Sequence, residues 1–204
     1  MYSETIDHTT QRVFEKIKDL SFLKDFYLAG GTALALQLGH RLSIDLDFFS
    51  PKDFSLEIIK ETLSQKGSFS VVAQEEGTLH ATLDGVKLTF LKYRYEMLFD
   101  LLNFSNVSMA DKRDIAAMKI DAISSRGSKK DFIDVFFLLQ QYQLSELLKF
   151  FEKKFSGVKY NTMHIRKSLV YFETADSEPM PNMLISVDWE EIKKRIISEA
   201  LNLE

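Results

Sequence analysis

The sequence predicts an α/β (α+β) protein, in which an N-terminal sheet unit with flanking helices precedes a C-terminal helical bundle. Short apolar runs separated by glycine and Asp-Gly turns occupy the first half of the chain. From about residue 109 onward, apolar residues recur at helical spacing instead. The 204 residues are 45% hydrophobic and contain no internal repeat or long linker. One substantial core is therefore expected.

The first elements read as helix, strand, glycine turn and helix. Apolar residues at helical spacing predict an amphipathic helix over residues 5–22. The apolar run at 26–29 predicts a strand, which two glycines end. An Ala/Leu-rich helix is expected over 33–38, and Gly39 ends it.

The next segment carries two acidic residues on a strand. Residues 44–49 alternate, which predicts a strand with Ile44, Leu46 and Phe48 on one face and both aspartates on the other. An Asp-Gly pair between two β-rich runs further on is a strong hairpin signal. The remaining elements expected in this half are a helix at 55–66, a strand at 68–74 and the hairpin strands at 78–84 and 86–93.

The second half is expected to be helical nearly to its end. Its phenylalanines, spaced as on helices, are best explained as the core of the bundle. A break is expected at 177–181, which contains two prolines. The candidate helices are 110–125, 129–142, 145–155, 160–174 and 188–201.

The acidic pair, Asp45 and Asp47, is a candidate metal site. Residues i and i+2 of a strand share a face, about 6 to 7 Å apart. At an effective dielectric near 20 their charges repel by roughly 2 to 3 kcal/mol, which favours a cation between them. Mg²⁺ suits such oxygen ligands. The alternative is a solvated edge strand whose aspartates pair with His40, Arg41 or Lys52, and for an isolated Asp-x-Asp that alternative is the commoner one.

The upstream glycine turn favours the metal site over the solvated edge strand. A helix that starts directly after a strand and two glycines presents free backbone N–H groups and a positive dipole end to an anion. Gly31 would allow a phosphate to approach closely. The hydroxyl of Thr32 could cap the helix, touch a phosphate oxygen, or do both.

These residues resemble the AbiEii/AbiGii toxin family of the polymerase-β-like nucleotidyltransferase superfamily. The matching stretches are GGTALAL at 30–36 and GHRLSIDLDF at 39–48, followed by AAMKIDA at 116–122 with Arg126, and KDFIDV at 130–135. Together they span about residues 26–139, and their combination is more specific than either half.

The resemblance implies a fold, an activity and partners. It implies a mixed sheet, with residues 1–108 as the nucleotidyltransferase α/β unit and residues 109–204 as a helical portion that completes the cleft within one compact unit. The implied activity is Mg²⁺- or Mn²⁺-dependent transfer of a nucleoside monophosphate from an NTP to an acceptor. The family setting suggests the toxin of a bacterial toxin–antitoxin or phage-defence system, tRNA as the acceptor and a cognate antitoxin.

The resemblance also assigns roles to residues. Lys119 corresponds to the lysine that contacts the NTP, and Asp134 to the last acidic position. Lys119 and Arg126 are seven residues apart, so both can face one cleft and meet the phosphates. The expected catalytic residues are Asp45, Asp47, Lys119 and Asp134, the first two of which bind the metal. The expected nucleotide-binding residues are Gly30, Gly31, Thr32, Arg41, Ser43, Arg126 and Asp131.

One position departs from the superfamily pattern. Many nucleotidyltransferases carry a third carboxylate on a later strand, where this chain has Thr89. If the two positions are equivalent, the general base for the acceptor hydroxyl is missing. Asp134 or Asp47 would then replace it, or the activity would be weak. His80 and His164 have no partners at metal-ligand spacing and are expected to be structural or exposed.

Composition limits the partners and leaves alternatives open. The net charge of −4 gives no overall sign of nucleic-acid binding, so an RNA acceptor would need a local basic surface. The absence of cysteine and of long apolar runs predicts a cytoplasmic protein without a membrane span. The alternatives are a small-molecule or protein acceptor, or a decayed nucleotide-binding module. The candidate basic residues are Lys149, Lys153, Lys154, Lys159, Arg166 and Lys167.

Overall fold

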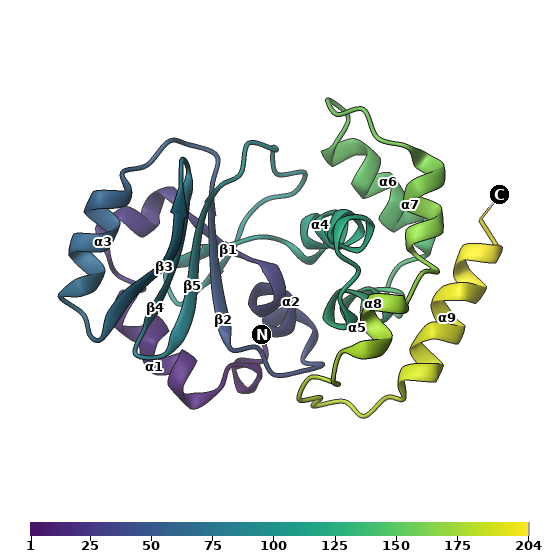
Figure 1. Ribbon diagram of the computed structural model, residues 1–204, viewed down its shortest axis with the longest axis horizontal. Helices are drawn as coiled ribbons and strands as arrows, with labels where there is room; N and C mark the ends of the chain where they lie inside the picture. The colour runs from purple at the N-terminus through teal and green to yellow at the C-terminus, as the bar shows by residue number, and fades with distance from the viewer. Residues whose placement is uncertain (204) are drawn as a thin grey trace. The chain divides into compact units, whose positions relative to one another are not determined.

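The chain forms two compact units. The computed structural model describes residues 1–203, and it divides into a sheet unit, Met1–Asp111, and a helical unit, Lys112–Glu204 (Figure 1). All strands of the described residues lie in the sheet unit. The predicted order of a sheet part before a helical part is therefore confirmed. Within residues 1–203, no helix has the length and apolar character needed to cross a membrane.

The sheet is mixed and has seven strands in the order β3-β4-β5-β2-β1-β7-β6. β2 pairs in parallel with β5 and antiparallel with β1, and β1 pairs in parallel with β7. The two metal-site candidates thus lie on a central strand. The strands are β1 (Tyr27–Ala29), β2 (Asp45–Ser50), β3 (Phe69–Glu75), β4 (Thr78–Leu83), β5 (Val86–Lys92), β6 (Leu102–Phe104) and β7 (Val107–Met109).

Helices lie on both sides of this sheet. Figure 1 shows α1 (His8–Ile17) and α3 (Leu56–Ser64) on one side and α2 (Gly30–Leu38) on the other. Under α1 and α3 lies a core of fully buried side chains that includes Leu46 and Phe48. The opposite face of β2 carries both aspartates, which are half-buried. Ile44 does not join the apolar face as expected, because the strand begins one residue later and leaves its side chain 51% exposed.

The first helix is shorter than predicted. The side chain of Asp7 accepts a hydrogen bond from the backbone N–H of Thr10 and so caps α1, which ends at Ile17 and not near residue 22. A 3₁₀ turn, Ser21–Asp25, follows. The turn directs Leu23 into the core, where it is 4% exposed, so packing overrides the helical pattern here.

Two tight hairpins shape the sheet, one expected and one missed. Asp84 and Gly85 have φ values of 50° and 84°, as a two-residue turn between β4 and β5 requires. Ser105 and Asn106, with φ values of 49° and 72°, make the equivalent turn between β6 and β7. This second hairpin was not predicted, because its strands have only three residues each and show almost no alternation of apolar and polar residues.

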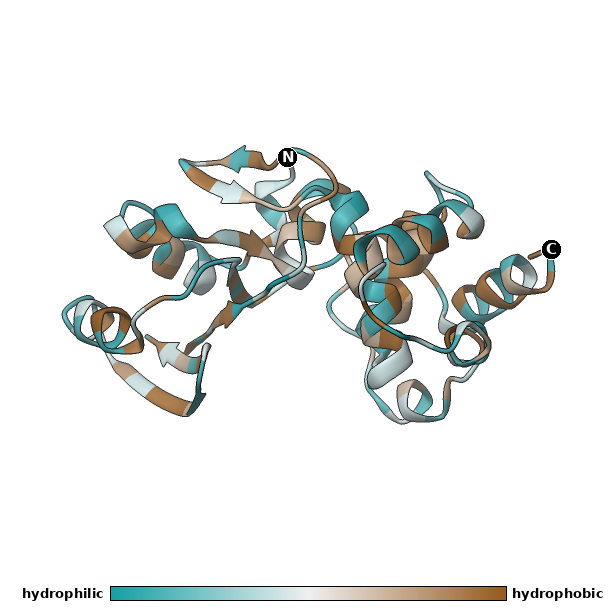
Figure 2. Ribbon diagram, turned by 90° about the horizontal axis from the view of Figure 1, so that it is seen from above, coloured by the Kyte–Doolittle hydropathy of each residue, from teal (hydrophilic) through white to brown (hydrophobic). Residues whose placement is uncertain are grey.

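The helical unit consists of helices around a core that contains several aromatic rings. Figure 2 shows brown and teal segments alternating along these helices. The predicted single helix at 160–174 is instead split into α7 and α8, because Phe172 turns inward and packs 4.8 Å from Phe132 and 5.8 Å from Trp189 between ring centroids. The helices are α4 (Lys112–Ser125), α5 (Lys129–Leu138), α6 (Leu144–Lys154), α7 (Thr162–Ser168), α8 (Glu173–Ser177) and α9 (Trp189–Leu201).

Candidate active site

The two glycines of the turn stand directly against the predicted site. Gly30 has φ +65°, and a Cβ added to it would collide with Asp47 Oδ2. A Cβ on Gly31 would lie 2.6 Å from Arg41 Nη2 and 3.5 Å from Ser43 Oγ. A larger residue at position 30 would strain the backbone, and one at position 31 would have to displace the guanidinium of Arg41. The structure therefore brings the glycine turn, Arg41, Ser43 and Asp47 together in the sheet unit.

Thr32 does not cap the helix, which was one of the two roles that the sequence suggested. Its side chain is buried, lies 2.7 Å from Ser43 Oγ and donates to the backbone carbonyl oxygen of Asp45. The capping residue of α2 is Ala29, and no side chain caps the helix. Thr32 thus holds the first turn of α2 to the entrance of β2. The capping interpretation was wrong, because the helix begins two residues before Thr32.

The start of α2 leaves donors available for an anion. The first four backbone N–H groups of a helix have no partner within that helix. Here they begin at Gly30, which touches Asp47, and the side chain of Thr32 is turned away toward β2. The positive end of the helix dipole and these N–H groups therefore lie beside the acidic pair. This is a suitable arrangement for a phosphate group that shares a cation with the two carboxylates.

The acidic pair fits a magnesium ion that also binds the substrate. Asp45 and Asp47 lie on the same face of β2, and no third His, Cys, Asp or Glu joins them in a cluster within residues 1–203. Mg²⁺ commonly uses one or two carboxylates and completes its shell with water and phosphate oxygens. Lys52, one of the alternative partners, is instead paired with Asp25 at 2.7 Å. His40 and Arg41 are both buried.

The neighbouring strand places a threonine beside Asp47. In the β2–β5 register, Asp47 is paired with Thr89, and Asp45 with Lys87. Thr89 is in turn paired with His80 on β4, and its Oγ1 lies 3.4 Å from His80 Nδ1. His80 is exposed, as one of the two expected alternatives has it, and it also contacts Thr89. The sequence does not reveal that His80 lies near Thr89 and Asp47, because the registers of the β4–β5 and β2–β5 pairs bring these residues together.

The second motif forms a buried cluster in the helical unit. Lys119 Nζ lies 2.9 Å from Asp131 Oδ1 and 2.6 Å from Asp134 Oδ2. Arg126 donates to both carboxylate oxygens of Asp131 through Nε and Nη2. The side chain of Lys119 is only 7% exposed, whereas that of Arg126 is 64% exposed. The four predicted residues are thus linked in one network through Lys119 and Asp131, and Arg126 is the most accessible of them.

The two cations determine the charge state of Asp131. Burial raises the pKa of Asp131, but the charge of Lys119 and the charge and hydrogen bonds of Arg126 outweigh burial and hold this pKa below its ordinary value. A carboxylate with a lowered pKa stabilises the fold above its ordinary pKa, and this stabilisation is lost as the pH falls through the pKa of the folded state. The ion pairs of Asp131 are therefore expected to persist at neutral pH and to fail in acid.

This leads to a prediction for acid unfolding. Replacing Arg126→Gln removes one cause of the lowered pKa of Asp131. The wild type should be more stable than the variant at pH 6, and the difference should narrow as the pH falls below about 4, where free aspartates protonate. Urea unfolding of both proteins at several pH values measures this difference in unfolding free energy. A difference that stays constant down to pH 3 would contradict the role given to Arg126.

Comparisons with known proteins agree with these two motifs. The sequence profile of the family described as "Nucleotidyl transferase AbiEii toxin, Type IV TA system" matches residues 12–102 and 83–202. The chain belongs to the AbiEii nucleotidyltransferase toxin family. It is a nucleotidyltransferase, and the resemblance seen in the sequence is confirmed.

Relatives of this AbiEii-family enzyme support the same fold. An uncharacterized protein of Aquifex aeolicus (strain VF5) is 40% identical, across 94% of this chain and 95% of that protein. The structure of JHP933 from Helicobacter pylori matches with a TM-score of 0.53 at 15% identity, over 94% of this chain and 87% of the other. MenT4, a nucleotidyltransferase toxin of Mycobacterium tuberculosis H37Rv, matches with a TM-score of 0.54 at 15% identity, over 88% and 76%. At such identities the two structures support the fold alone.

The basic residues of the helical unit do not all lie at the surface of the AbiEii-family protein. Lys149, Lys153, Lys159 and Lys167 are exposed, and Arg166 is half-buried. Lys154 does not belong to this set, because it lies 2.7 Å from Asp114 and both side chains are fully buried. The sequence could not separate Lys154 from its neighbour, since both are charged residues near the end of α6.

The buried pair gives a stability prediction. Lys154→Met leaves the Asp114 carboxylate buried without its cation, which should cost about 3 to 5 kcal/mol of unfolding free energy. The neighbouring exposed lysine provides a matched control, and Lys153→Met should change the stability by less than about 0.5 kcal/mol. Urea unfolding followed by circular dichroism compares them. Equal stability of the two variants would disprove the structural role of Lys154.

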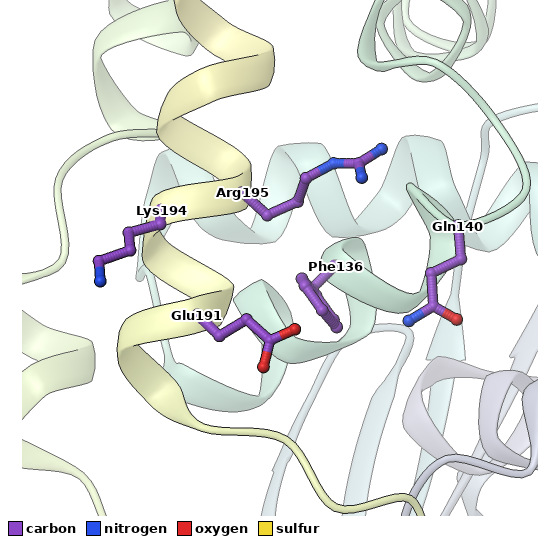
Figure 3. Close-up of a pocket in the computed structure, with 5 residues that line it drawn as sticks. All are labelled: Phe136, Gln140, Glu191, Lys194 and Arg195. Atoms are coloured by element: carbon purple, nitrogen blue, oxygen red, sulfur yellow. The ribbon is translucent and has the colours of Figure 1, made fainter.

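The helical unit of the AbiEii-family enzyme also has a hollow, of about 460 Å³, between α5 and α9 (Figure 3). Phe136 and Gln140 line one side, and Glu191, Lys194 and Arg195 extend from α9. Arg195 is paired with Glu199 and donates to the carbonyl oxygen of Leu139. None of the predicted site residues lines this hollow. It is not assigned to the reaction.

Proposed function

We propose that this nucleotidyltransferase moves a nucleoside monophosphate from an NTP to the hydroxyl of an acceptor, with Mg²⁺ held by Asp45 and Asp47. The observation that carries the proposal is the close approach of Gly30 and Gly31 to Asp47, Arg41 and Ser43. The backbone conformation of Gly30 explains one glycine, and a second glycine beside a carboxylate and a guanidinium at the start of a helix supports a bound triphosphate, which needs close approach to backbone N–H groups.

Two groups of residues take part, one in each unit. The N–H groups at the start of α2 bind phosphate oxygens, and Ser43 contributes a hydroxyl next to them. Mg²⁺, when bound, neutralises charge on the transferring phosphoryl group and lowers the pKa of the attacking hydroxyl. In the helical unit, Lys119, Arg126, Asp131 and Asp134 form a second charged cluster, from which the exposed guanidinium of Arg126 binds a phosphate.

We propose tRNA as the acceptor and a toxin as the biological role. The exposed lysines of α6, α7 and the segment between them, Lys149, Lys153, Lys159 and Lys167, offer a local basic surface despite the net charge of −4. The Type IV toxin–antitoxin description of the family supports a cognate antitoxin as a partner. We propose phage defence as the setting in which such a toxin acts. A toxin of this kind acts in the cytoplasm.

Incubation with each labelled NTP, total tRNA and Mg²⁺ tests the proposal. We expect label to enter RNA with one or two of the four nucleotides, and EDTA to abolish the transfer. Label on the protein itself, or on a small molecule added in place of tRNA, would reassign the acceptor. NTP binding without any transfer would favour the decayed nucleotide-binding module, which the threonine at position 89 makes the main rival.

A further inference from the structure

A row of side chains crosses the open face of the sheet next to Asp47. Residues paired directly across adjacent strands share a face. Asp47 is paired with Thr89, Thr89 with His80, and His80 with Ala73. With strands about 4.8 Å apart, the side chain of Thr89 is one strand and that of His80 two strands from the acidic pair. Thr89 therefore occupies the place beside Asp47 where a third carboxylate would stand.

The contact between Thr89 and His80 could pass a proton from the half-buried threonine to the exposed histidine. Thr89 is half-buried and His80 is exposed. Thr89 Oγ1 is 3.4 Å from His80 Nδ1, so the hydroxyl can donate to this nitrogen after a small side-chain rotation. Catalytic hydrogen bonds are often long without substrate and shorten in the reactive complex. The exposed ring can then release a proton to water.

The charges around His80 are few. On the same face, the neighbouring strand β5 carries Lys87 and the neighbouring strand β3 carries Glu75. β4 itself presents Thr78 and Thr82 on this face, which do not ionise in this range, and α3 packs on the opposite side of the sheet. Asp45 and Asp47 follow one strand beyond Thr89. Among the described residues of this face, the charged neighbours on β3 and β5 are thus one anion and one cation, and the acidic pair lies further away.

We infer that Thr89 and His80 together replace the missing third carboxylate as the base that deprotonates the acceptor hydroxyl. The inference rests on the proposed nucleotide transfer. Thr89 meets the reacting hydroxyl, and His80 acts through Thr89 as a positioning residue and final proton acceptor.

Proton transfer to His80 accompanies the attack on the α-phosphorus. The acceptor O–H bond breaks and its proton moves to Thr89 Oγ1, while the proton of Thr89 moves to His80 Nδ1. The acceptor oxygen forms a bond to the α-phosphorus. The bond from the α-phosphorus to the bridging oxygen breaks, and pyrophosphate leaves with the electron pair. The imidazolium returns its proton to solvent, and the threonine hydroxyl is restored.

The test uses single-turnover transfer from labelled NTP to total tRNA. Thr89→Val and His80→Asn should each lower the rate about 10²-fold, which lies in the usual range for general base catalysis. The double variant should be no slower than either single variant, because residues that act as a unit are not additive. NTP affinity and melting temperature should stay at the wild-type values, and His8→Asn, on the exposed start of α1, serves as the control.

A rescue experiment separates a base from a structural contact. Thr89→Asp in the His80→Asn background restores a carboxylate beside Asp47 and should return the rate to within about tenfold of wild type, as a base placed directly at the site would. The acid limb of its pH–rate profile should also move to lower pH, because a carboxyl group titrates below an imidazole.

The possible outcomes distinguish the two proposals. No transfer by the wild type with any NTP would overturn the proposed function, and the relay with it. Wild-type transfer together with full activity of His80→Asn or Thr89→Val would overturn the relay alone. Losses that add in the double variant, or a Thr89→Asp variant that does not recover, would show two independent structural contacts and reject the shared base.

Discussion

Transfer of nucleotide should fall by about 10³-fold or more when Asp45→Asn and Asp47→Asn are combined. A tenfold loss corresponds to 1.36 kcal/mol, so this loss is about 4 kcal/mol, comparable to the several kcal/mol that a metal ion contributes to phosphoryl transfer. Amides are weak ligands for Mg²⁺ in comparison with carboxylates. Calorimetric titration of NTP should accordingly show that Mg²⁺ no longer strengthens binding.

A control with the same change of charge makes this result specific. Asp53 is 88% exposed and is paired with Lys92 in the same sheet unit. Asp53→Asn should therefore keep wild-type transfer and Mg²⁺-dependent NTP binding, because an exposed ion pair contributes little. If the double variant still bound NTP as tightly as wild type in Mg²⁺, the acidic pair would be an ordinary solvated strand face, and the proposed metal site would be lost.

Lys119→Met should have the second large effect, on stability as well as on rate. The ammonium group lies between Asp131 and Asp134, whose side chains are at most 1% exposed. Removing it leaves two buried carboxylates to repel each other, which should cost about 3 to 5 kcal/mol of unfolding free energy. The exposed lysine at the start of α5, Lys130, provides the control, and Lys130→Met should be nearly neutral.

Separating the two effects of Lys119 requires conditions in which the variant is folded. Transfer measured where circular dichroism shows the native helical signal reports the catalytic part alone. We expect a further loss of 10- to 100-fold there, about 1.4 to 2.8 kcal/mol, since the cluster positions Arg126 through Asp131. A folded Lys119→Met protein with the wild-type rate would make the whole cluster structural and confine the active site to the sheet unit.

The sequence by itself determined the order of the elements and the family. The glycine turn before an Ala/Leu-rich helix, the alternation around Asp45 and Asp47, and the Asp84-Gly85 turn are local signals that the structure retains, because each is set by the backbone conformation or by the period of one element. The second motif was recognised by its resemblance to the family, with Lys119 and Arg126 at helical spacing on one predicted helix and Asp131 and Asp134 on the next.

Only the tertiary structure decided how these residues are used. Thr32, predicted as a possible helix cap, instead links α2 to β2 by a hydrogen bond. Lys154, predicted as a surface charge, instead forms a buried ion pair with Asp114. His80 came beside Thr89 through the register of β4 and β5. The physical reason is common to these cases. Burial and pairing depend on contacts between residues far apart in sequence, and neither propensity nor periodicity encodes which partner a polar side chain will meet.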